Sequence, residues 1–228
     1  MKLADLNRAP TYQTTLPHSK KNITFRPFTV AEQRTLLQVQ EDGDAASITA
    51  TLVKLLNTCV EGISVENINP VDFEWLLVQL RIRSVGAQLK LRVKCTSCEK
   101  INIHEASLSD AHMVGTEAKD SNVDLLNGLI LVMKTPTMVD LQAAGDSKEM
   151  QLAACFKQIV DGENVFNVND YSAEERKAFV DSLNQPQLMA IEKWLATAPR
   201  LELDLELGCQ HCGAEIKRTV KGLMDFLA

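Results

Sequence analysis

Two closely spaced cysteine pairs constrain this chain more than any other feature of its 228 residues. Cys95 and Cys98 form the first Cys-x-x-Cys motif, and Cys209 and Cys212 form the second. Zn²⁺ prefers about four soft ligands in a tetrahedral arrangement, and each pair supplies half of such a set. The four cysteines therefore predict one bound Zn²⁺. A closed set of four sulfurs leaves no position for water or substrate, so the predicted role of the ion is structural.

Each cysteine pair lies between two segments in which apolar and polar residues alternate. The first pair is flanked by residues 89–94 and 100–104, and the second by residues 201–207 and 214–217. Strict alternation is typical of half-buried strands, so each pair is predicted at the tip of a β-hairpin. Zinc ribbons usually place their pairs about 15–20 residues apart. Here the metal would join distant parts of the chain, unless one pair is incidental and its thiols are free.

Helical periodicity is found in most of the remaining sequence. Thr29 and Glu32 form a capping-box pattern that begins a helix extending to about residue 40. Apolar residues at helical spacing predict further helices, and one apolar run predicts a strand. The helices are expected at residues 48–60, 69–86, 138–144, 148–160, 173–183 and 187–197, and the strand at 128–134.

These elements predict an α+β fold that is mainly helical, with a small antiparallel zinc-ribbon-like sheet built from the two sequence-distant Cys-x-x-Cys hairpins. The polar N-terminal segment contains Pro10 and Pro17 and is interpreted as an extended arm. The expected organisation is an arm at 1–22, a helical unit at 23–86, a split zinc-ribbon module at 87–106 and 200–220, a mostly helical insertion at 107–199, and an apolar tail at 221–228.

Composition excludes several classes of protein. The apolar run Leu129–Met133, which no other run exceeds in length, is far shorter than the roughly 20 residues that cross a bilayer. The first residues lack the apolar stretch of a secretory signal, so a reducing cytosol is the expected setting. In that setting paired cysteines indicate metal binding rather than disulfides. Cys59 and Cys155 stand apart in apolar helical contexts and are predicted to be buried.

The sequence lacks the motifs of the common catalytic sites. It contains no nucleophile elbow, P-loop, dinucleotide-binding glycine pattern or His-Glu-x-x-His helix. The side chains that could act in their place are four histidines and three aspartates, namely His18, His104, His112, His211, Asp124, Asp140 and Asp161. The histidines have no partner at a motif spacing, and His211 is not needed to complete a four-sulfur set. We therefore expect no catalytic residues and no small-molecule substrate.

Two charged strand faces leave a second functional class open. The first hairpin carries a basic row, Lys90, Arg92, Lys94 and Lys100. A zinc-ribbon nucleic-acid-binding protein would use such a row. The second hairpin carries an acidic row, Glu202, Asp204 and Glu206. The two rows could instead pair with each other if the hairpins lie side by side. Because the formal net charge is -6, broad attraction to nucleic acid is not expected.

Short motifs in a fixed order extend over nearly the whole chain. They are Leu16-Pro17, Arg26–Glu32, Asp72, Leu80–Gly86, the first cysteine pair, Thr135–Met138, Asp161-Gly162, Pro199, Cys209, Cys212, Gly213 and Gly222–Phe226. In this order and spacing the chain resembles the baseplate hub assembly proteins of contractile-tailed bacteriophages. One position departs from the pattern, because Leu227 stands where a second aromatic residue is expected.

The resemblance implies a late viral protein, either a baseplate hub assembly chaperone or a component of the hub. The resemblance also implies that the two cysteine pairs are metal ligands. The implied partners are other baseplate hub or tail proteins, with no membrane involved. The chaperone role is preferred, because an acidic body with a polar arm and an apolar tail suits transient capture of a partner. The protein is then expected in the host cytoplasm during assembly, and in the virion tail baseplate if it is a hub component.

Overall fold

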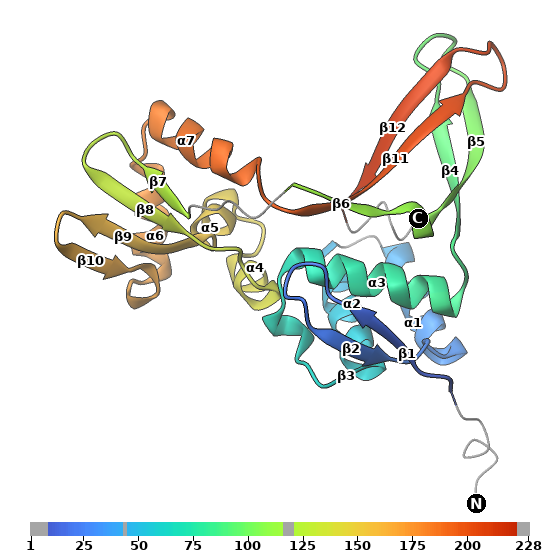
Figure 1. The fold of residues 1–228 in the computed structure, drawn as a ribbon, viewed down its shortest axis with the longest axis horizontal. Coiled ribbons are helices and arrows are strands. Elements are labelled where there is room, and N and C mark those ends of the chain that lie inside the picture. Colours follow the sequence, from blue (N-terminus) through green and yellow to red (C-terminus); the bar gives the residue numbers. More distant parts are fainter. Residues whose placement is uncertain (1–8, 43–44, 116–120, 223–228) are drawn as a thin grey trace, which may run out of the picture. The chain divides into compact units, whose positions relative to one another are not determined.

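The computed structural model describes residues 9–42, 45–115 and 121–222. The chain divides into two compact units (Figure 1). The first unit takes its described residues from Met1–Val65, Val71–Val114 and Arg200–Ala228, and the second from Glu66–Pro70 and Gly115–Pro199. The first unit is therefore built from chain segments on both sides of the second.

The N-terminal part of the first unit combines a three-stranded antiparallel sheet with three helices. The strands, in the order β1-β2-β3, are β1 (Tyr12–Thr15), β2 (Asn22–Phe25) and β3 (Val60–Glu61). The helices are α1 (Val30–Asp42), α2 (Ala45–Cys59) and α3 (Pro70–Ser84). Apolar residues at helical spacing bury one face of α2 and α3, namely Leu52, Leu56, Phe73, Leu76 and Leu80.

Residues 12–19, from the segment predicted as an arm, form β1 and the start of the turn to β2, and they pack within this part of the unit. The side chain of Leu16 is fully buried. The backbone N–H groups of His18 and Ser19 donate to the Asp72 carboxylate at 2.8 and 3.0 Å. Trp75 Nε1 donates to Thr14 Oγ1 at 2.9 Å. Residues 1–8 of the predicted arm and 223–228 of the predicted tail lie outside the described residues.

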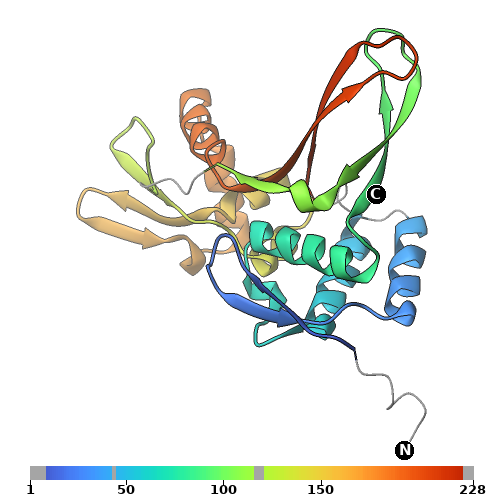
Figure 2. The same cartoon turned by 45° about the vertical axis from the view of Figure 1, so that its right-hand side comes forward.

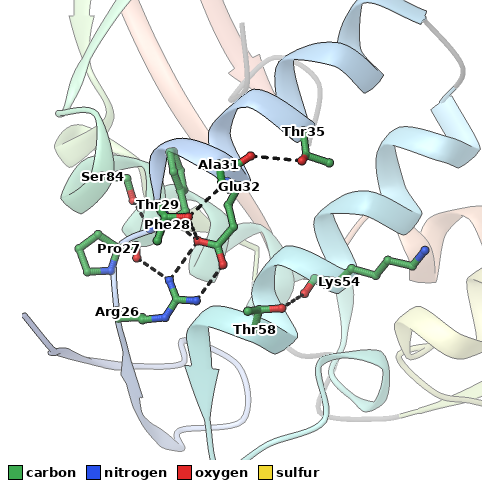
Figure 3. A network of polar contacts seen from close by, with 10 residues as sticks. All are labelled: Arg26, Pro27, Phe28, Thr29, Ala31, Glu32, Thr35, Lys54, Thr58 and Ser84. Carbon is green, nitrogen blue, oxygen red and sulfur yellow. Dashed lines mark hydrogen bonds and ion pairs between the residues drawn. The ribbon is translucent and has the colours of Figure 1, made fainter. Parts of the chain in front are cut away.

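A polar network holds the start of α1 (Figure 3). Arg26 donates from both terminal nitrogens to the Glu32 carboxylate, at 2.8 and 3.0 Å. The same carboxylate accepts the backbone N–H of Thr29, and Thr29 Oγ1 accepts the N–H of Glu32 at 3.3 Å. This reciprocal capping box satisfies two helix-terminal N–H groups, as the sequence pattern predicts. Ser84 Oγ accepts the N–H of Phe28 at 3.0 Å and thereby links this segment to α3.

Two long hairpins form the rest of the first unit. The first is β4 (Gln88–Lys94) with β5 (Ile101–Ser107), and the second is β11 (Arg200–Gly208) with β12 (Glu215–Lys221). β6 (His112–Val114) pairs with the beginning of β11. Figures 1 and 2 show the hairpins side by side, with their turns at the same end. Their inner faces bury one apolar cluster that includes Leu89, Leu91, Val93, Leu201 and Ile216.

The described residues of the second unit form a four-stranded antiparallel sheet and four helices. The strands, in the order β10-β9-β8-β7, are β7 (Asn122–Asp124), β8 (Leu129–Met133), β9 (Phe156–Asp161) and β10 (Asn164–Asn167). The helices are α4 (Met138–Ala144), α5 (Lys148–Ala153), α6 (Ala173–Asp181) and α7 (Gln185–Leu195). This unit has its own core around Leu131, Phe156 and Ile191. None of the helices in the described parts of the chain is long and apolar enough to cross a membrane.

The expectation of a mainly helical chain with one ribbon-like sheet is wrong. Described residues form four antiparallel sheets, and the cysteine hairpins belong to two of them, β4-β5 and β12-β11-β6. The hairpins meet through side chains rather than through a shared hydrogen-bond ladder. The helix expected at 148–160 ends at Ala153, and β9 follows it. Helical content is overestimated because β1, β2, β3, β6, β7 and β10 contain only two to four residues each, too few for alternation to be recognised.

Candidate metal centre

The four cysteine sulfurs come together where the turns of the two hairpins meet. The Sγ atoms of Cys95 and Cys212 are 3.8 Å apart, and those of Cys98 and Cys209 are 3.6 Å apart. All four lie within 4.8 Å of one another. Residues 117 positions apart in the chain therefore contribute to one cluster. Four sulfurs at these separations could hold a metal ion.

The two turns have the same backbone geometry. In the first, the N–H of Cys95 donates to Lys100 O at 2.9 Å, and in the second the N–H of Cys209 donates to Ala214 O at 2.8 Å. In each turn the N–H two residues after the first cysteine points at that cysteine's Sγ, at 3.4 Å. The residue after the second cysteine has a left-handed conformation in both turns, at Glu99 (φ 58°) and Gly213 (φ 73°). Each knuckle thus turns a pair of sulfurs and at least one N–H donor toward the same point.

Hydrogen bonds within the cluster separate the pKa values of the thiols. Burial raises the pKa of Cys209, but the N–H groups of His211 and Cys212 and the neighbouring thiols outweigh it, so the pKa is lowered to about 6. At Cys212 the N–H of Ala214 favours the thiolate, yet the sulfurs of Cys209 and Cys98 raise the pKa to about 12. The N–H groups of Cys98 and Ser97 lower the pKa of Cys95. A divalent cation would favour the ionised form of all four, because it supplies the missing positive charge.

Polar contacts that the sequence did not indicate join the two hairpins beside the sulfurs. Asn102 is fully buried, and its Oδ1 accepts the N–H of Gln210, within the second cysteine turn, at 2.7 Å. Gln210 Nε2 donates to Ile103 O at 2.9 Å. A further bond joins the hairpins where Arg218 donates to Arg92 O at 3.3 Å. The signal that could have identified Asn102 is a polar residue at a position whose cross-strand partner, Val93, is buried.

The histidines have separate surroundings. His211 is exposed, and its Nε2 lies 3.3 Å from Ile101 O. His112 Nε2 lies 3.6 Å from Asp204 Oδ2 on the neighbouring strand. Nε2 of His104, on β5, is buried and has no hydrogen-bond partner within the described residues. His18 belongs to the β1–β2 turn, where its N–H binds Asp72. The four-sulfur set therefore contains no histidine.

The aspartates that the sequence suggested as capping or surface groups have such positions. Asp140 closes the capping box of α4 with Thr137, and Lys134 Nζ donates to it at 3.0 Å. Its pKa is lowered: burial opposes the ionised form, but the N–H of Thr137 and the Lys134 ammonium outweigh that. Asp124 Oδ1 accepts the N–H of Leu126 at 2.8 Å. Asp161 ends β9 and precedes the turn to β10.

Some charges of each row are paired within their own hairpin. On the first, Lys90 lies 3.9 Å from Glu105, and Lys94 lies 3.5 Å from Glu99. On the second, Lys217 lies 3.4 Å from Glu206 and 3.3 Å from Glu215. These charges point outward on separate hairpins. The basic row is therefore interrupted by acidic groups, which weakens its attraction for a polyanion.

The chain matches a known protein family. The family described as T4 bacteriophage base plate protein matches residues 9–228. The matched stretch includes both cysteine pairs and both units of the fold. No curated protein and no solved structure matches the chain.

Proposed function

We propose, from the premise that this chain belongs to the family of T4 bacteriophage base plate proteins, that it is a non-enzymatic assembly factor of the phage tail. It would act as a baseplate hub assembly chaperone or as a component of the hub, through contacts with other baseplate or tail proteins. The observation that carries this proposal is the family match over residues 9–228. The sequence contains none of the common catalytic motifs, which agrees with a role in protein contacts.

The second part of the proposal is one structural Zn²⁺ held by Cys95, Cys98, Cys209 and Cys212. What supports it is the donor set, four sulfurs within 4.8 Å of one another at the tips of two matching turns. Four thiolates complete a tetrahedral site, so the ion would have no open position for chemistry. It would hold the two hairpins together, and the surface that recognises a partner would depend on it.

Metal analysis of the purified chain tests the zinc site. One zinc per chain is expected, and the double variant Cys95→Ser, Cys209→Ser should lose it. Cys155→Ala is the matched control, because Cys155 is a buried thiol of the second unit that is outside the sulfur cluster. Stoichiometric zinc in the double variant, or none in folded wild-type protein, would contradict the site.

Co-expression with the other baseplate and tail proteins of the same phage tests the assembly role. A stable or transient complex with at least one hub protein is expected. A variant that lacks residues 1–8 and 223–228 keeps β1 intact. It tests whether these parts of the predicted arm and tail make that contact. Mass spectrometry of purified virions then separates a retained hub component from a chaperone that is released. A chain that binds none of these proteins would contradict the proposed function.

A further inference from the structure

An apolar cavity of about 390 Å³ lies in the second unit, whereas the cysteine cluster belongs to the first unit. Phe156 and Ile159 of β9, Phe166 of β10 and Phe179 of α6 line it. Phe156 and Phe179 meet edge to face, with ring centroids 6.2 Å apart. The volume and the lining suit one large apolar side chain.

The cavity opens at residues that remain exposed. Phe166 and Tyr171 both line it, and each retains 40% of its surface. β10 is an edge strand of its sheet, and all four of its residues are exposed. Its sequence, Asn-Val-Phe-Asn, contains neither the charge nor the proline that usually protects an edge. Aromatic side chains at the rim of such an opening are typical of a site for another protein.

Arg176 supplies a charge at this cavity. Among the described lining residues it is the only cation, and its side chain makes no ion pair or hydrogen bond within the described part of the chain. Its Nε is buried and has no partner among the residues that the structure describes. The neighbouring acid, Glu175, is engaged elsewhere, because its Oε2 accepts the N–H of Ser172 at 2.9 Å in the capping box of α6. A buried donor without a partner is unfavourable, and a carboxylate would let the guanidinium turn and form a charge-assisted bond.

We propose that this cavity, bounded by β9, β10 and α6, is a docking site for a partner protein segment that presents an aromatic or large aliphatic side chain beside an Asp or Glu. The apolar side chain fills the cavity and the carboxylate binds Arg176. This inference rests on the proposed function, since it names a contact surface of an assembly factor. The choice of an acidic and apolar segment comes from charge complementarity with Arg176, which is the one cation among the described residues that line the cavity.

The direct test is an NMR titration of the full-length protein with the peptide Ac-Asp-Phe-Leu-NH₂. Saturable shifts are expected at residues 166, 171, 176 and 179, with millimolar affinity for so small a probe. Ac-Asn-Phe-Leu-NH₂, which lacks the charge, should bind about tenfold more weakly. Octanoate offers a carboxylate and an apolar chain without a backbone, and it should bind no more tightly than the peptide. Equal binding of the two peptides, or tighter binding of octanoate, would overturn the proposal.

Two variants and a matched control locate the contact. Arg176→Gln and Phe166→Ala should each weaken binding of the acidic peptide by about tenfold or more. Val165→Ala should leave the affinity for this peptide unchanged. Val165 is the adjacent β10 residue, is 55% exposed and does not line the cavity. An equal effect at positions 165 and 166, or no effect at 176, would refute the site.

Co-expression separates this inference from the proposed function. If wild-type protein forms the baseplate complex and Arg176→Glu still forms it with normal zinc content, the docking site is wrong and the assembly role stands. If wild-type protein forms no complex, the assembly role is wrong, and the peptide titration alone decides whether the cavity binds acidic apolar segments.

Discussion

At the scale of single residues, the cysteine turns depend on the residue that follows each second cysteine. Gly213 and Glu99 occupy equivalent positions and share a left-handed φ. Glycine adopts this conformation without a steric penalty, whereas other residues pay about 1–2 kcal/mol. The first turn therefore contains a strained residue that the second turn avoids.

Gly213→Ala should destabilise the protein by about 1 kcal/mol. A Cβ at this position would meet no atom within 4 Å, so the backbone conformation alone causes the loss. Gly208→Ala is the matched control, because Gly208 also has open space around it but no left-handed φ. Chemical denaturation in the presence of zinc measures both. Equal effects of the two substitutions would contradict the explanation.

The Arg26–Glu32 pair makes stability depend on pH. Hydrogen bonds from Arg26, aided by the N–H and hydroxyl of Thr29 and opposed by burial, lower the pKa of Glu32 to about 2. A lowered pKa in the folded state stabilises the fold above the ordinary value near 4.5, and this contribution is lost as pH falls toward 2.

Glu32→Gln should therefore reduce the free energy of unfolding at pH 7, by roughly 2 kcal/mol. The difference from wild type should shrink as the pH is lowered from 5 toward 2. Glu105→Gln removes an exposed pair with Lys90 and should change stability by less than about 0.5 kcal/mol. Urea denaturation at several pH values checks this, and a difference that grows with acidity would have the wrong sign.

At the scale of elements, the register of the first hairpin decides which residues reach the metal centre. Leu89, Leu91 and Val93 of β4 are buried, so their β5 partners Ala106, His104 and Asn102 share that inner face. Ile101 and Ile103 consequently point outward and are 53% and 58% exposed. The polar residue Asn102 thus lies on the inner face next to the cysteine turns, where its hydrogen bond with Gln210 joins the two hairpins.

Asn102→Ala should destabilise the protein by about 1–3 kcal/mol and weaken metal binding. The substitution leaves the N–H of Gln210 without its partner and removes the contact that positions the second cysteine turn. Ile103→Thr, on the outer face of the same strand, should have little effect. Thermal unfolding and competition with a zinc chelator measure the two properties. Unchanged zinc affinity in Asn102→Ala would show that the bond does not support the site.

At the scale of the whole molecule, the sulfur cluster joins segments that lie on both sides of an inserted unit. Cys95 and Cys212 are 117 positions apart. Closing so long a loop costs conformational entropy, and a cross-link over about 100 residues is worth roughly 4–5 kcal/mol. The second unit has its own core and does not contribute a sulfur.

Metal removal should therefore affect the two units unequally. A strong chelator is expected to speed hydrogen exchange at least tenfold in β4, β5, β11 and β12, because their packing loses its cross-link. Amides of β8, β9 and α7 in the second unit should keep their protection. Hydrogen exchange read by mass spectrometry distinguishes the segments, and uniform loss of protection would mean that the units do not unfold separately.

The sequence by itself determined the two cysteine turns, the strands that lead into and out of them and the long helices, because spacing, alternation and capping residues are local properties. Tertiary structure alone decided the remaining features. Leu152, Cys155, Phe156 and Ile159 fit a helical spacing, yet β9 begins at Phe156 because it pairs with both β8 and β10. The inward orientation of the Asn102 side chain and the separation of the hairpins into two sheets likewise depend on cross-strand partners. Such partners are distant in the chain, so a local pattern cannot select them.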